Sequence, residues 1–272
     1  MLKLIRSNLT RITKSKTFWI CSAVYLAFCL SVAIYTRQYP LEGNFKKVVW
    51  EMYSNSNPCF TNLGYSASPA TGIIVLLYVS IIVGADLRNG TIRNQIIVGH
   101  SKTSIYLSNL FACLICIAPV NLAYLLLSLF TMPSETFTPT LFVWIFFNNI
   151  LTILLYISLY ILLMTTTKNT IATLICGSGL TACFVLISQT MIHDVLSGSS
   201  AYELLLVAFF PTGYDTLIAN GFIRNFEIYI AFYDKYVDVF KPLFYLFPLI
   251  SICMSALTTT AGIALFKKSN LK

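Results

Sequence analysis

The residues that could carry out chemistry are few in this chain and are far apart. The two histidines, His100 and His193, are separated by three long apolar runs. If those runs cross a membrane, the histidines face opposite sides, so they cannot share a metal ion. The sequence contains no His-Glu-x-x-His motif, no Gly-x-Ser-x-Gly elbow and no Gly-x-x-x-x-Gly-Lys-[Ser/Thr] phosphate loop. We therefore expect no metal site, no cofactor and no catalysis, including ATP hydrolysis, in this chain alone.

Cysteines and acids are the other candidates for chemistry. Seven of the eight cysteines lie in apolar runs and only Cys59 does not, which predicts no disulfide framework. Cys113-x-x-Cys116 has no second pair, so we interpret it as packing. An enzyme acting on lipid would need acids clustered at one interface, and a solvated acidic loop is the alternative. The candidate acids are Asp194, Glu203, Asp215 and Asp234.

The segment from Asp86 to Thr103 has the most informative spacing in the chain. Asn89-Gly90 can end one helix, because both residue types tolerate a left-handed backbone. Thr91 can cap a short new helix, on which Ile92 and Ile96 lie one turn apart and face the membrane. Gly99 can end that helix, and Ser101 can cap the next one. The segment would present two cations to the cytosol, Arg88 and Arg93. The predicted element is a two-turn rod that can transmit a push, and the alternative is a loop that only sets topology.

The composition indicates which elements position this rod. Of the 272 residues, 57% are hydrophobic and only 10% are charged, against about 25% charged in an ordinary soluble domain. The mean hydropathy is +0.77. A soluble core of this size could not bury so much apolar surface, and disorder requires the opposite composition. We expect an all-α integral membrane protein.

Six runs lack Asp, Glu, Lys, Arg and His, and each is about long enough to cross a bilayer as a helix. The predicted spans are about residues 18–36, 69–85, 103–132, 139–167, 169–192 and 242–266. No soluble domain interrupts them, so residues 1–272 form a single six-helix domain. A cleaved signal peptide is the weaker alternative for the first run.

The distribution of charge predicts the orientation of these spans. Twelve of the 18 Lys and Arg lie in segments 1–17, 86–102, 168 and 267–272, with one acid, Asp86. The positive-inside rule therefore puts these segments and both termini in the cytoplasm. The net charge of +8 flanks apolar runs rather than forming a basic face, so we expect no nucleic-acid partner.

Two further segments are predicted to lie along the membrane surface. In residues 2–14, apolar and basic side chains recur at helical spacing, which predicts a basic amphipathic helix within the interfacial segment 1–17. Its expected partner is membrane lipid. Its apolar face comprises Leu2, Ile5, Leu9 and Ile12. Residues 203–210 are too short to span and predict a re-entrant or interfacial helix before the last span. The predicted spans contain no ionisable group, which argues against ion-coupled transport.

Several stretches resemble the type-2 ABC transporter permeases of Gram-positive bacteria. The most specific is Asp86-Leu-Arg88-Asn89-Gly90-Thr91-Ile92-Arg93-Asn94, followed by Gly99-His100-Ser-Lys-Thr. Pro211-Thr212-Gly213, in the last outer loop, and the lysine-rich ending Gly262–Lys272 are also similar to segments of these permeases. Asp86 stands where Glu is more usual in that family.

The resemblance implies the fold, the partners and the role of the rod. It implies six spans per subunit, a second copy or paralogue of the permease, and separate ABC ATPase subunits that hold ATP and Mg²⁺. Residues 87–100 would include the coupling helix seated on the ATPase, and residues 2–14 the connecting helix. The expected function is export across the bacterial plasma membrane of a hydrophobic or amphipathic substrate, such as an antimicrobial peptide, drug or lipid. The alternative is a sensor or accessory subunit that binds a peptide or lipid without moving it.

Overall fold

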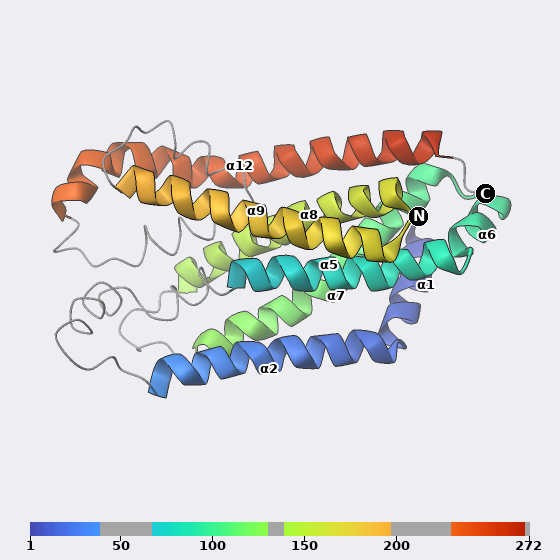
Figure 1. The fold of residues 1–272 in the computed structure, drawn as a ribbon, viewed down its shortest axis with the longest axis horizontal. Helices are drawn as coiled ribbons and strands as arrows, with labels where there is room; N and C mark the ends of the chain where they lie inside the picture. The colour runs from blue at the N-terminus through green and yellow to red at the C-terminus, as the bar shows by residue number, and fades with distance from the viewer. Residues whose placement is uncertain (39–66, 130–138, 197–229, 270–272) are drawn as a thin grey trace.

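The computed structural model describes residues 1–38, 67–129, 139–196 and 230–269 of the chain. This part of the chain is helical and contains no strand. Its eight helices are α1 (Leu2–Thr13), α2 (Lys16–Gln38), α5 (Ala67–Arg88), α6 (Thr91–Ile97), α7 (Lys102–Leu129), α8 (Pro139–Thr167), α9 (Thr170–Leu196) and α12 (Ile230–Lys268) (Figure 1).

Length and apolar composition explain why the long elements are helices. A helix satisfies all its own backbone hydrogen bonds, which hydrocarbon surroundings require. Within the described residues, four helices contain a segment long and apolar enough to cross a membrane, and α2 and α9 contain shorter apolar segments. The four segments are Thr71–Arg88, Lys102–Ala123, Asn149–Thr167 and Pro248–Lys268. These are the features of an α-helical membrane protein, as the composition predicts.

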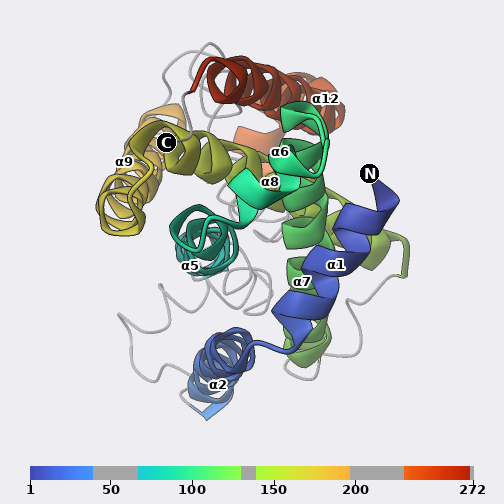
Figure 2. The ribbon, with the colours of Figure 1, turned by 90° about the vertical axis from the view of Figure 1, so that its right-hand side faces the viewer.

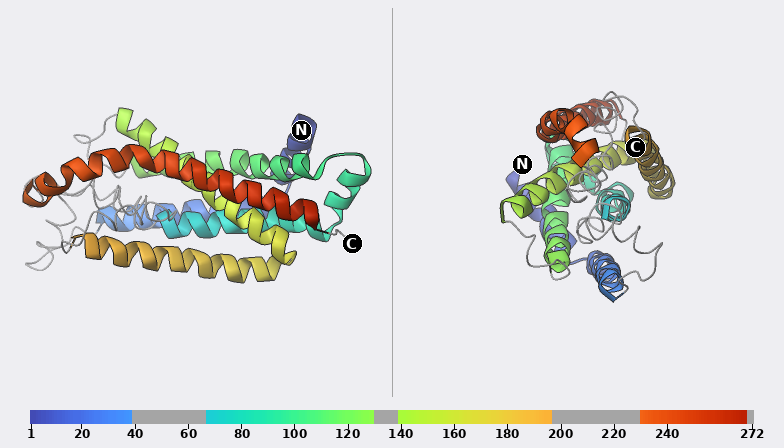
Figure 3. Two further views of the ribbon diagram at one scale, coloured as in Figure 1. Left: turned by 90° about the horizontal axis from the view of Figure 1, so that it is seen from above. Right: turned by 90° about the vertical axis from the view of Figure 1, so that its left-hand side faces the viewer.

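The long helices run side by side along the long axis of the molecule (Figures 1 and 3). Helix α8 packs against α5, α7, α9 and α12, while α5 packs against α2, α7, α8 and α9. Viewed along the bundle, α2 and α9 lie on different sides of α5 (Figure 2). The largest fully buried side chains include Tyr78 on α5, Tyr106 on α7 and Tyr156 and Tyr160 on α8. The core is therefore built around α5, α7 and α8.

Several helix boundaries differ from the charge-free runs that define the predicted spans. Helix α5 continues through Asp86 to Arg88, α9 continues through Asp194 to Leu196, and α12 begins at Ile230, well before the predicted residue 242. Charged residues do not stop a helix, so a span defined by missing charge underestimates helix length. The predicted re-entrant helix at 203–210 lies outside the described residues.

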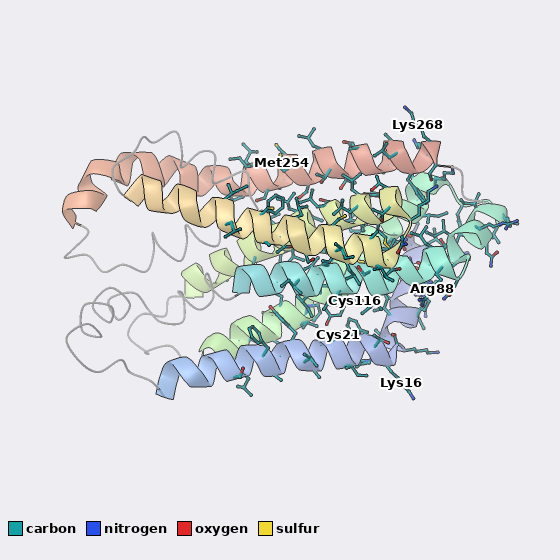
Figure 4. All side chains as sticks on the ribbon, viewed as in Figure 1. Lys16, Cys21, Arg88, Cys116, Met254 and Lys268 are labelled. Atoms are coloured by element: carbon teal, nitrogen blue, oxygen red, sulfur yellow. The ribbon has the colours of Figure 1, made fainter. Side chains whose placement is uncertain are left out.

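One end of the bundle collects most of the charged side chains of the described residues, and we call it the basic end. It comprises α1, α6, the turn between α8 and α9, and the last turn of α12 (Figure 1). Lys16, Arg88 and Lys268 lie there together in Figure 4. Within the described chain Asp86 is the one acid at this end, and the other cations there are Lys3, Arg6, Arg11, Lys14, Arg93, Lys102, Lys168 and Lys267.

Candidate functional site

Helix α6 is a short rod bounded by two glycines. Gly90 has a φ of 67°, is the N-cap residue and separates α6 from α5. After the helix, Gly99 has a φ of 97°. The Gly99 N–H donates to the Ile96 carbonyl (2.9 Å) and the His100 N–H to the Gln95 carbonyl (3.1 Å). These two hydrogen bonds together form the Schellman motif, which requires a left-handed residue at the position of Gly99.

The predicted limits of the rod are close to those observed, but its capping differs. Thr91 is the first helical residue and makes no capping bond, because Gly90 occupies the N-cap position. Ser101 does cap the next helix, since its Oγ accepts a hydrogen bond from the Ser104 N–H (3.2 Å). Helix α6 therefore joins α5 and α7 through two tight, glycine-dependent turns.

The apolar side of α6 faces the bundle. Ile92 is 2% exposed and belongs to the core cluster, and Ile96 packs against that cluster. The expectation that both face the membrane is wrong for this reason: they cover the ends of α5 and α7, the helices with which α6 has its main contacts. Arg93 and Asn94 are exposed, as is Arg88 at the end of α5. The outward surface of α6 therefore combines a cationic and a polar side chain, Arg93 and Asn94, with the exposed apolar side chain of Ile97.

Helix α1 is attached to the bundle by a half-buried ion pair. Asp86 is completely buried, while the side chain of Arg11 is 40% exposed. The guanidinium binds the carboxylate through both nitrogens: Nη1 donates to Oδ1, and Nη2 donates to Oδ2 at 2.7 Å. A two-point Arg–carboxylate contact fixes geometry as well as charge. Asp86 therefore positions α1 from inside the protein, and its carboxylate has no exposed surface.

A second polar contact holds the same helix. Asn8 Nδ2 donates to Asn109 Oδ1 on α7 (2.7 Å), and both residues are buried. Leu4, Asn8 and Ile12 form the buried face of α1. The predicted apolar face is only partly correct, because Leu9 and Ile12 pack on the bundle whereas Leu2 is exposed.

The end of α12 is fixed at the basic end by Lys102, the first residue of α7. Its ammonium donates to the carbonyls of Lys267 and Ser269, both at 2.9 Å. Carbonyls at a helix C-terminus lack partners within the helix, so a cation there is favourable. One turn further along α7, the Tyr106 ring lies 6.1 Å from that of Phe266. The contact is close enough that a Cβ at Gly262 would clash with the Tyr106 hydroxyl.

The structure brings most of the predicted site residues together at the basic end. The end of α5 and the turn after it contain Asp86, Arg88, Asn89 and Gly90. Helix α6 contains Thr91, Ile92, Arg93 and Asn94, and it is followed by Gly99 and His100. Pro211, Thr212 and Gly213 lie outside the described residues. The sequence analysis did not identify Asn8, Arg11 and Asn109 as contacts. One signal indicated that Asp86 would need a cationic partner, without identifying which: it is the single acid among many cations in the segments predicted to lie on one side.

The described part of the chain contains no group of three His, Cys, Asp or Glu residues that could hold a metal ion. Cys113 and Cys116 are free thiols buried in the core cluster. The basic end thus combines an exposed short helix between two long helices with a second short helix that is fastened by polar contacts.

Comparison with known proteins adds no family to this description. No family model matches the chain, and no curated protein matches it significantly.

Proposed function

We propose that this chain is the membrane-spanning subunit of an ATP-driven exporter of the type-2 ABC class. In this proposal α2, α5, α7, α8, α9 and α12 are the six spans, and the basic end faces the cytoplasm of a bacterial cell. Two such subunits, identical or paralogous, enclose the pathway. Two separate ATPase subunits bind below them and hold ATP and Mg²⁺.

The observation that carries the proposal is the construction of α6. It is a short helical rod with an exposed face that includes Arg93, Asn94 and Ile97, and one buried anchor, Ile92. Gly90 and Gly99 join it directly to α5 and α7. A force applied to α6 must therefore pass into both helices. An element of this kind is suited to receive movement from a partner that seats on its outer face.

The remaining contacts of the basic end indicate how such movement spreads. Arg11 couples α1 to the last turns of α5, and Asn8 couples it to α7. Lys102 couples the start of α7 to the end of α12. A push on α6 thus reaches four helices through short, directional contacts, and in the proposed mechanism it alters the cavity between two subunits.

The position of charge within the candidate spans supports an external energy source. In the four segments long enough to cross a membrane, the charged residues Asp86, Arg88, Lys102, Lys267 and Lys268 all lie at the basic end. Proton- or sodium-coupled carriers place such groups at membrane depth. The apolar walls of the spans favour a hydrophobic or amphipathic substrate, such as an antimicrobial peptide, drug or lipid.

Reconstitution with candidate ABC ATPase subunits from the source organism tests the proposal. The complex should co-purify and hydrolyse ATP, and Arg93→Gln should lower the coupled rate, while Lys268→Gln removes an exposed charge at the same end as a control. Flux of a fluorescent amphipathic peptide into inverted vesicles distinguishes an exporter from a non-transporting sensor, which would bind the peptide without ATP-dependent movement. Full ATP-dependent flux with residues 87–100 scrambled would refute the coupling role.

A further inference from the structure

A pocket opens on one face of α5 near the basic end, between α2 and α9. Its volume is about 430 Å³. The α5 residues that line it include Leu77, Ser80, Gly84 and Arg88. They recur every three or four positions and therefore share one face of the helix. Figure 2 shows α2 and α9 on different sides of this helix, so the pocket is a groove along α5 with a wall on each side.

The groove has the depth of one membrane leaflet. Leu77 and Arg88 are eleven positions apart on a continuous helix, which corresponds to about 16 Å at about 1.5 Å per residue. The hydrocarbon core of a bilayer is about 30 Å thick. The groove therefore reaches from the level of the basic end to roughly the middle of the membrane.

The walls and the mouth of the groove differ in character. The deeper walls are apolar, with Phe18 from α2, Ile81 from α5 and Leu174 from α9. At the mouth, Arg88 is exposed, and the described part of the chain holds no ion pair to it. The charge of Arg11 is balanced by Asp86. None of the residues that line the groove is acidic, so its mouth carries a net positive charge.

Ser80 supplies an independent indication of an occupant. It is buried, with an exposed fraction of 3%, and lines the groove. Its hydroxyl has no hydrogen-bond partner within the described structure. Buried hydroxyls are normally satisfied, so an unpaired one in a groove wall points to a ligand that carries an acceptor oxygen.

We propose that this groove binds one anionic phospholipid of the leaflet next to the basic end. The phosphate pairs with Arg88, and an ester oxygen accepts a hydrogen bond from the Ser80 hydroxyl. An acyl chain lies against Phe18, Ile81 and Leu174. A cation above an apolar wall one leaflet deep matches the two ends of such a lipid. The inference requires only that the chain is embedded in a membrane and is independent of ATP coupling.

Native mass spectrometry of the purified full-length chain tests this site. The chain is released from detergent after incubation with equal amounts of dioleoylphosphatidylglycerol and dioleoylphosphatidylcholine. We expect one phosphatidylglycerol to be retained in preference to phosphatidylcholine. Arg88→Gln should lower that retention about tenfold, the effect of about 1.4 kcal/mol of lost binding, whereas Lys268→Gln, an equal charge change outside the groove, should not.

Two further experiments test whether the groove binds the acyl chain of the lipid. Ile81→Trp fills the groove and should abolish selective retention of lipid; if it does not fold, Leu174→Phe fills the same space from α9. An excess of glycerol 3-phosphate should not displace the lipid, because it lacks the acyl chain. Equal retention of the two lipids, no effect of Arg88→Gln, unchanged retention in the folded filling variant, or displacement by glycerol 3-phosphate would each overturn the proposal.

Discussion

Helices α1 and α6 lie at the same end of the bundle, and both are short, but they are attached to it in different ways. Helix α1 is held by an ion pair with a buried carboxylate, by a buried Asn–Asn hydrogen bond, and by Leu4 and Ile12. Helix α6 has one buried side chain, Ile92, and a left-handed glycine before it and after it.

The difference indicates that the two helices have different mechanical properties. Buried polar contacts are directional and costly to break, so α1 must move with α5 and α7. A single apolar contact is non-directional and leaves the outer face of α6 open. We infer that α1 is a fixed part of the bundle, whereas α6 is the element through which a partner can act. Hydrogen exchange should show slower exchange along α1 than along α6.

Removing the cation of the buried pair should have the largest effect on stability. In Arg11→Met, the carboxylate of Asp86 remains buried without a counter-charge, which costs about 3 kcal/mol of unfolding free energy. Asp86→Asn should cost less, about 1 kcal/mol, because the half-exposed Arg11 can turn toward water. Equilibrium unfolding in mixed micelles measures both values.

The ion pair predicts a specific pattern across these variants. Arg11→Met combined with Asp86→Asn should be more stable than Arg11→Met alone, because the buried charge is then gone. Lys14→Met provides the matched control, since it removes an exposed cation just beyond the same helix. If Arg11→Met is no less stable than Lys14→Met, α1 is not held by this pair, and the contrast with α6 disappears.

Truncating the apolar anchor of α6 should have a smaller and more local effect. Ile92→Ala removes most of the one side chain that α6 buries, and the loss corresponds to about 2 kcal/mol. Because α6 can loosen without unfolding the bundle, we expect faster hydrogen exchange in residues 91–97 and little change in α1. Ile97→Ala, at an exposed position on the same helix, is the control. Equally faster exchange in α1 would show that the two helices are not independently attached.

The sequence predicts the elements of this comparison better than their contacts. Apolar runs, Asn89-Gly90 and Gly99 define where helices begin and end, because these signals are local. Whether Ile92 faces lipid or protein is not local: it depends on how closely α5 and α7 approach. The sequence pattern predicted that Ile92 faces lipid, whereas in the structure it packs against protein.

The attachment of α1 was harder to predict for a similar reason. Asn8 and Asn109 are 101 positions apart, and Arg11 and Asp86 are 75 positions apart. A single sequence indicates that a lone buried acid needs a cation, but several cations lie close enough in the predicted topology. Only the packing of α1 across α7 and the end of α5 selects Arg11.

Changing the backbone at the start of α6 should have an effect of about 1 kcal/mol. Gly90 has a φ of 67°, where a β-branched residue is strained, and a Cβ added there would meet no atom within 4 Å. Gly90→Val should therefore be destabilised by backbone strain alone, whereas Gly90→Asn, which tolerates this conformation better, should be close to the wild type. Thermal unfolding of the two variants checks the difference. Equal stability of both would show that α6 does not depend on this left-handed turn.

The smallest effect on stability is expected for the residue most important to the proposed coupling. Arg93 is exposed, and the described residues hold no ion pair to it, so Arg93→Gln should change unfolding free energy by less than about 0.5 kcal/mol. If the outer face of α6 receives a partner, the same variant should weaken co-purification of the ATPase and lower coupled ATP turnover. Arg6→Gln, on the exposed face of α1, should leave both unchanged. If Arg6→Gln weakens coupling and Arg93→Gln does not, the ATPase contacts α1 and not α6, and the proposed roles of the two helices are wrong.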